Sequence, residues 1–122
     1  MCTNTQVLLS FFLAFRISFP RYRGEYSTEL FTRKGIDWIT NITNEGRQPG
    51  GTKQKTLLYM SYQAVHGPIE APPLPYDAAC GHIREPTRHT YCEMMQSLDD
   101  SIGNITAAYT KLGIFDDTVR CV

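Results

Sequence analysis

The sequence predicts an α/β domain in which a helix, a strand, a long helix and a second strand follow one another. Apolar residues at helical spacing in residues 26–45 and 86–112 predict the two helices. The first half of residues 56–68 and residues 118–122 are short apolar runs beside turn-forming residues, which predicts the two strands. An alternation of helices and strands is typical of domains that cover a sheet with helices.

The composition of the sequence limits the classes of protein to which the chain can belong. A chain of 122 residues with 42% apolar residues is long enough for one domain with one core. Twelve basic and twelve acidic residues cancel, so no net field would recruit nucleic acid or an anionic membrane. The longest apolar run, residues 7–15, is too short to span a bilayer as a helix. We therefore expect neither a nucleic acid nor a membrane as partner.

Residues 1–20 stay unassigned, and residues 21–122 are interpreted as one partial domain. The run at 7–15 has the length of a signal-peptide core. No basic residues precede it, and no small-x-small cleavage site follows it. A core strand or a helix end is the alternative interpretation of this stretch.

The first predicted helix extends from Tyr26 to Glu45. Ser27 or Thr28 can cap it by accepting from the free amides of the first turn. Its apolar stripe recurs every three or four residues. The stripe consists of Phe31, Gly35, Trp38, Ile39 and Ile42. The glycines and proline of residues 46–51 are expected to end the helix.

The second predicted helix extends from Pro86 to Leu112. Pro86 suits the first helical turn, because backbone amides there have no acceptor within the helix and the missing N–H of proline costs no hydrogen bond. Gly113 is expected to end the helix in the left-handed conformation.

His66 follows the first predicted strand and precedes a Gly-Pro break and a proline-rich loop. In open α/β sheets, ligands bind at the carboxyl ends of strands, so His66 is a candidate to act on a substrate. A lone histidine is more often structural than catalytic, and position alone leaves that alternative open.

Four residues between 80 and 92 have the chemistry of metal ligands or of a cross-link. Cys80, His82, His89 and Cys92 could together bind zinc, although their spacing matches no common structural zinc site. Alternatively, Cys80 and Cys92 can form a disulfide if their Cα atoms approach within roughly 4.4–6.8 Å. No CxxC pair is present.

Two sequons predict glycosylation. Asn41 and Asn104 each begin an Asn-Ile-Thr triplet. Together with an even number of cysteines, they favour the secretory pathway.

The residues also resemble the arylsulfatases, specifically the arylsulfatase B-like branch. The resemblance covers roughly residues 22–120 in order, and its most specific part is the Ser-Tyr-Gln-Ala-Val-His block that ends at His66. The similar segments are residues 26–34, 58–68, 88–95, 98–106 and 112–119.

The resemblance implies part of an alkaline-phosphatase-like domain that hydrolyses sulfate esters of small molecules or glycans, in lysosomes or outside the cell. In that family a cysteine of a Cys-x-Pro/Ser-x-Arg motif becomes formylglycine, whose hydrate attacks sulfur. Calcium and basic side chains neutralise the sulfate oxygens. His66 stands at the position of a family histidine that binds the sulfate or helps to protonate the leaving oxygen.

The departures from the family pattern are equally informative. Residues 80–84, Cys-Gly-His-Ile-Arg, imitate the cysteine motif. Their third residue is His82, where the motif has proline or serine, and the segment follows His66 instead of preceding it. The family's N-terminal Asp-Asp calcium ligands, the Lys-x-His segment and the Asp-Asn-Gly motif that follows the last core strand are missing. We therefore expect calcium only in a complete domain and no turnover by this chain alone. The chain is then a fragment of a longer enzyme or a degenerate relative, with a non-catalytic secreted glycoprotein that uses the scaffold for binding as the alternative.

Overall fold

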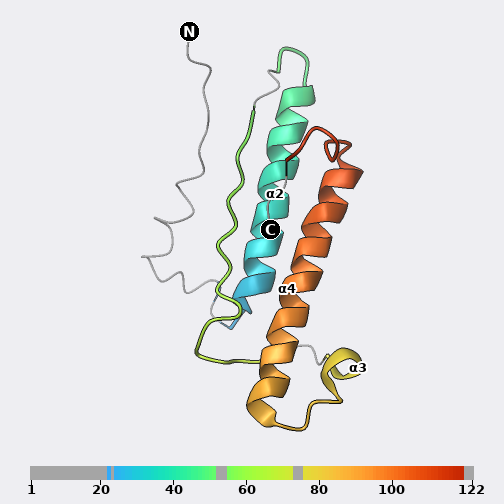
Figure 1. Ribbon diagram of the computed structural model, residues 1–122. Coiled ribbons are helices and arrows are strands. Elements are labelled where there is room, and N and C mark those ends of the chain that lie inside the picture. The colour runs from blue at the N-terminus through green and yellow to red at the C-terminus, as the bar shows by residue number, and fades with distance from the viewer. Residues whose placement is uncertain (1–21, 23, 52–54, 73–75, 120–122) are drawn as a thin grey trace.

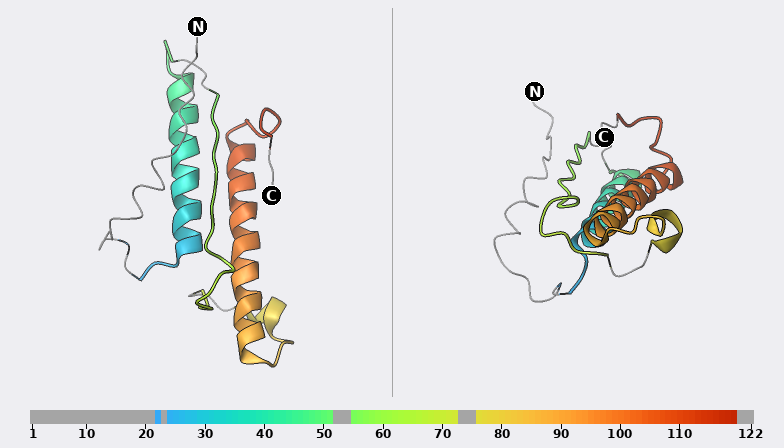
Figure 2. Two further views of the ribbon diagram at one scale, coloured as in Figure 1. Left: turned by 60° about the vertical axis from the view of Figure 1, so that its left-hand side comes forward. Right: turned by 60° about the horizontal axis from the view of Figure 1, so that its bottom comes forward.

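Two long helices that lie side by side and point the same way dominate the computed structural model (Figure 1). The structure describes residues 22, 24–51, 55–72 and 76–119. Helix α2 covers Ser27–Arg47, α3 is the short helix Asp77–Cys80, and α4 covers Pro86–Lys111. An extended segment, residues 55–63, runs back along one side of the pair, as both views of Figure 2 show. Residues 1–20, including the apolar run at 7–15 and its alternative interpretations, lie outside the described residues.

Helix α2 packs mainly through small residues. Its buried residues are Thr28, Thr32, Gly35 and Ile39, which are spaced by four, three and four positions and so share one face. Gly35 and Ile39 belonged to the predicted apolar stripe, whereas its other members, Phe31, Trp38 and Ile42, are only half-buried. The predicted cap is wrong, because Tyr26 takes the N-cap position and no side chain there bonds to the first-turn amides.

Helix α4 begins and ends close to the predicted residues. Pro86 opens the helix, and the Glu85 carboxylate accepts from the backbone amides of Thr87 and Arg88 at 3.1 and 2.6 Å. These bonds satisfy two of the amides that a helix start leaves without partners. After the helix, Gly113 adopts a φ of 64°, which confirms the predicted left-handed stop. The Arg47 guanidinium donates to the Leu112 carbonyl and so links the ends of α2 and α4.

The predicted strands are not found among the described residues. Apart from an isolated β-bridge at Leu57, the first predicted strand is an extended segment without a neighbouring strand in the described ranges. Thr118 and Val119 form no strand, and the rest of the second predicted strand lies outside the described residues. A sheet needs hydrogen-bonded neighbours, and the parts of the chain that the structure describes do not supply them.

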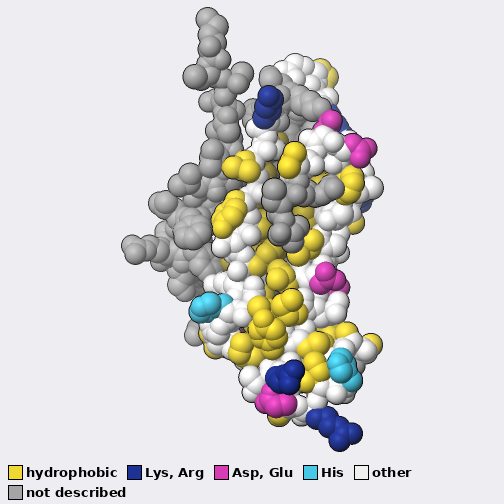
Figure 3. Space-filling view, in the orientation of Figure 1, with side chains coloured by type: hydrophobic (Ala, Val, Ile, Leu, Met, Phe, Trp, Pro, Cys, Tyr) yellow, Lys and Arg dark blue, Asp and Glu magenta, His cyan; other side chains and the backbone are white. Residues whose placement is uncertain are grey.

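The extended segment nevertheless keeps the alternation of a strand. Met60 and Leu58 point toward α2, since a Cβ added to Gly35 would lie 3.1 Å from the Met60 sulfur and 3.8 Å from a Leu58 methyl carbon. Leu57 and Tyr59 point outward and are 59% and 78% exposed. Figure 3 shows hydrophobic side chains running down the face seen in Figure 1. One surface of the helix pair is therefore only partly covered by the described residues.

The apolar core is small. Among the described residues, the buried hydrophobic side chains are Ile39, Cys80, Met94 and Tyr109. None of the described helices combines the length and the apolar character that a membrane crossing requires.

Candidate functional site

His66 lies in a tight turn at the end of the extended segment. The turn is closed by the backbone amide of His66, which donates to the Gln63 carbonyl at 2.8 Å. The imidazole is exposed to solvent and is not enclosed by apolar neighbours. The structure thus places the histidine where a ligand could reach it, but at the end of an extended segment and not of a strand within a sheet.

A hydrogen bond defines which ring nitrogen of His66 carries the proton. Nδ1 lies 2.7 Å from the Gly67 carbonyl oxygen. Because a carbonyl can only accept, Nδ1 must be the donor, and in the neutral ring Nε2 then carries the lone pair. A proton taken up by the ring would therefore reside on Nε2, which could donate it to an oxyanion.

Two tyrosine contacts hold the chain on either side of His66 to the start of α2. Before the turn, the Tyr62 hydroxyl and Thr32 Oγ1 are 2.9 Å apart. Thr32 Oγ1 donates its hydrogen to the Thr28 carbonyl at 2.7 Å, so Tyr62 is the donor in this pair. After the turn, the Tyr26 hydroxyl donates to the Glu70 carbonyl at 3.4 Å. Burial is the largest cause that raises the pKa of both Tyr26 and Tyr62.

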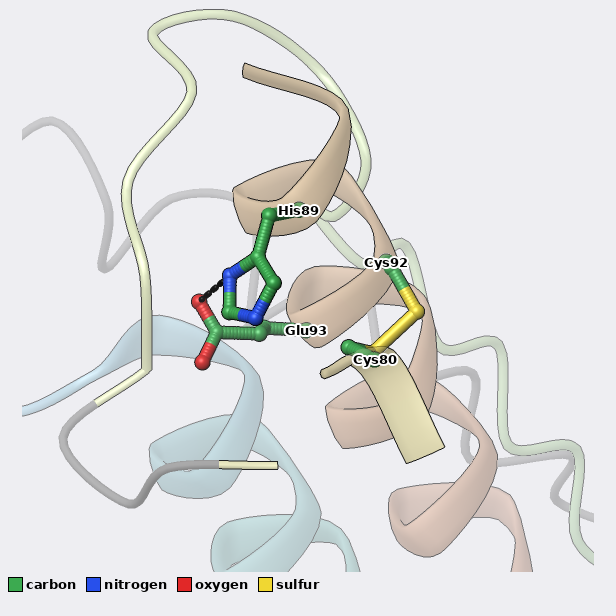
Figure 4. Close-up of a disulfide and its surroundings, with 4 residues drawn as sticks. All are labelled: Cys80, His89, Cys92 and Glu93. Atoms are coloured by element: carbon green, nitrogen blue, oxygen red, sulfur yellow. Dashed lines mark ion pairs between the residues drawn. A yellow bond between two sulfur atoms is a disulfide. The ribbon is translucent and has the colours of Figure 1, made fainter. Parts of the chain in front are cut away.

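The candidate zinc ligands do not form a metal site. Cys80 and Cys92 are joined in a disulfide with a Cα–Cα distance of 5.8 Å, which fastens α3 to the first turns of α4 (Figure 4). His89 Nδ1 faces Glu93 Oε2 at 3.6 Å, and His82 is exposed. A disulfide sulfur is no thiolate, so the zinc module considered from the sequence is wrong. The same bond occupies the cysteine of the segment that imitates the formylglycine motif.

The described residues do not fit a calcium site. Within these residues, no group of three His, Cys, Asp or Glu side chains comes close enough to hold a metal ion. Calcium needs six to eight oxygen ligands, and adjacent carboxylates such as Asp99 and Asp100 point apart on a helix. The calcium expected of a complete domain is therefore assigned no ligand among the residues that the structure describes.

The two sequons occupy different surroundings. Asn41 on α2 and Asn104 on α4 are both exposed. Asn104 also lines a groove of about 610 Å³ between the two helices. Sequence reasoning missed this groove, because it exists only where α2 and α4 lie side by side. The lining residues are Glu29, Thr32, Arg33, Ile36, Asp37, Tyr76, Ser97, Asp100, Ser101, Asn104, Ala107, Ala108 and Lys111.

Comparison with known proteins identifies relatives of the chain. The sequence model of the family described as Sulfatase matches residues 2–120. Arylsulfatase J of Mus musculus is 30% identical over 96 residues, which are 79% of this chain and 14% of that protein. No solved structure matches. The chain thus spans a small part of the length of this curated relative.

Proposed function

Because this chain belongs to the sulfatase family, we propose that it is the part of an arylsulfatase-type hydrolase that presents His66 to the sulfate group. Members of the family hydrolyse sulfate esters, so the substrate class is a sulfated small molecule or glycan. The observation that carries the proposal is the solvent-exposed His66, whose Nδ1 is held by the Gly67 carbonyl while Nε2 keeps its lone pair.

His66 can serve sulfate ester hydrolysis in two ways. A protonated Nε2 can donate a hydrogen bond to a sulfate oxygen, where negative charge is spread in the transition state. It can also transfer its proton to the ester oxygen as the S–O bond breaks, so that the leaving group departs as a neutral alcohol or phenol. The ring is then neutral and recovers a proton from water. The bond between Nδ1 and Gly67 keeps the orientation of the ring the same in both states.

Apart from His66, no residue that the structure describes is assigned to the reaction. Cys80 and Cys92 are committed to their disulfide, so neither supplies the nucleophile that attacks sulfur. The described residues offer no calcium site, and no step of the proposal is routed through a metal. The proposal therefore places turnover in a longer polypeptide, of which this chain contributes the histidine.

The test has two stages. Sequencing the transcript on both sides of this reading frame should find a Cys-x-Pro/Ser-x-Arg motif upstream and Asp-Asn-Gly downstream. In that longer product, His66→Ala should lower kcat for an aryl sulfate by roughly 10²–10⁴-fold, the usual contribution of a general acid. The matched control is His82→Ala, because His82 is also exposed but lies outside the turn. Absence of both motifs, or equal activity of the two variants, would overturn the proposal.

A non-catalytic secreted glycoprotein that uses the scaffold for binding is the second candidate. It is favoured by the exposed apolar side chains of Leu57 and Tyr59, since such residues often mark interaction surfaces. The disulfide fits the oxidising secretory pathway that both candidates need. A purified 122-residue chain that unfolds cooperatively, from a transcript that lacks both sulfatase motifs, would favour this candidate.

A further inference from the structure

We propose that the groove between α2 and α4 is a carbohydrate-binding site that holds the first sugars of an N-glycan attached to Asn104. The inference concerns a surface that the proposed hydrolase chemistry does not use. It rests only on the expectation that the chain passes through the secretory pathway. The carrying observation is that a sequon asparagine is itself one of the lining residues of a groove of about 610 Å³.

The size of the groove suits a short stretch of sugar. Ligand sites in proteins commonly measure about 300–1,000 Å³, and this groove falls within that range. Asn104 is exposed, so its side-chain amide nitrogen is accessible for the attachment of a sugar. A glycan attached inside the groove loses little further entropy when it binds there, because its first sugar is already tethered to Asn104.

The chemistry of the groove suits sugar hydroxyls and acetamido groups. Glu29 and Asp37 on α2 and Asp100 on α4 all line the groove, and their carboxylates accept hydrogen bonds from hydroxyl groups. Arg33 supplies donors beyond the one that binds Glu25 at 2.5 Å. Ala107 and Ala108 add apolar surface on which the C–H face of a sugar ring can rest.

Tyr76 supplies a half-buried aromatic side chain to the groove. Burial is the main reason that the pKa of Tyr76 is raised, and Ser97 and Asp100 beside its hydroxyl also affect it. An aromatic ring beside carboxylates combines apolar contact with directed hydrogen bonding, which is the arrangement that small-ligand sites use. Asn41 provides the comparison, since it carries the same triplet but does not line the groove.

The experiment uses the 122-residue chain secreted from a eukaryotic host. Three forms are compared: the intact glycoprotein, the glycoprotein trimmed by an endoglycosidase to one sugar per site, and the Asn104→Gln variant. The readout is the rate at which an acetylating reagent modifies Lys111, which lines the groove, measured site by site by mass spectrometry. Lys34 and Lys55, which do not line it, serve as internal references.

The intact glycan should slow the modification of Lys111 several-fold, and trimming or Asn104→Gln should remove that protection. Thr106→Ala should act like Asn104→Gln, because it blocks attachment while keeping the asparagine. Asn41→Gln should leave the protection unchanged. An unmodified Asn104 in the secreted chain, or a Lys111 rate that ignores the glycan, would overturn the proposal. Neither outcome depends on sulfatase activity, so the two proposals can fail separately.

Discussion

Two regions attach to the α2–α4 pair in different ways. Residues 77–92 are fastened by the Cys80–Cys92 disulfide and by the Glu85 cap at the start of α4. Residues 55–70, which include His66, are held by the packing of Met60 on Gly35 and by two tyrosine hydrogen bonds. The region that carries His66 is thus the one with the weaker attachment among the described residues. Its position depends on a few side chains, whereas the other region is constrained by a covalent bond.

The largest expected effect is on the covalently attached region. Replacing both cysteines, Cys80→Ser and Cys92→Ser, should lower the free energy of unfolding by about 3 kcal/mol, because the disulfide closes a loop in the unfolded chain. Urea unfolding followed by the fluorescence of Trp38, the single tryptophan, measures this change. An unfolding midpoint that is the same with and without a reducing agent would show that the bond does not stabilise the fold.

The next effect is on the contact between α2 and the extended segment. Gly35→Val should destabilise the chain by about 1–3 kcal/mol, because even its Cβ would lie 3.1 Å from the Met60 sulfur and the two methyl groups extend further. The matched control is Gly103→Val on α4, where nothing lies within 4 Å of an added Cβ. Both variants change helix propensity equally, so their difference isolates the contact.

Limited proteolysis adds a local readout to this pair of variants. If the segment leaves α2, chymotrypsin should cut at Tyr59 faster in Gly35→Val than in Gly103→Val. Equal stability and equal cleavage of the two variants would mean that Met60 moves aside and that this contact does not hold the His66 region.

A smaller effect is expected from the hydrogen bond between Tyr62 and Thr32. Tyr62→Phe should lower the free energy of unfolding by about 1 kcal/mol, the usual net contribution of one such bond. Tyr59→Phe is the control, because that side chain is 78% exposed. Equal unfolding midpoints for the two variants would contradict the assignment of this bond as an attachment point.

The dependence of the free energy of unfolding on alkaline pH gives a second test of the Tyr62 hydrogen bond. Burial raises the pKa of Tyr62 above that of an unfolded tyrosine, so folding favours the neutral phenol. This contribution is fully present below the unfolded pKa and is lost as the pH rises through the raised folded pKa. Tyr62→Phe should therefore lose less stability than the wild type between neutral and strongly alkaline pH.

The comparison also explains which features the sequence could predict. Both long helices were predicted to within about two residues, because apolar spacing and signals such as Pro86 and Gly113 act locally. The cap of α2 was wrong, since Tyr26 and not Ser27 or Thr28 occupies that position. A shift of one residue at a helix start changes which side chain can cap it.

The strand prediction failed for a different reason. Residues 56–62 have the alternation of a strand, and Leu58, Met60 and Tyr62 do point to one side. Pairing, however, depends on neighbours that are distant in sequence, and the described ranges contain none. The exposure of His66, its bond to Gly67 and the groove at Asn104 likewise depend on contacts between segments. The resemblance makes His66 a candidate site residue, and only the coordinates describe its surroundings.

The smallest predicted effect concerns Glu85 at the start of α4 and the stability of the helix in acid. Glu85 has a lowered pKa, chiefly because its carboxylate accepts from the Arg88 amide and then from the Thr87 amide. Its contribution to stability is present above the unfolded pKa and is lost as the pH falls through the lowered folded pKa. Glu85→Gln should therefore reduce the decline of helical circular dichroism in acid, whereas Asp99→Asn, an exposed carboxylate within α4, should leave that decline unchanged. If Glu85→Gln follows the wild type through the acid range, the disulfide alone fixes the start of α4.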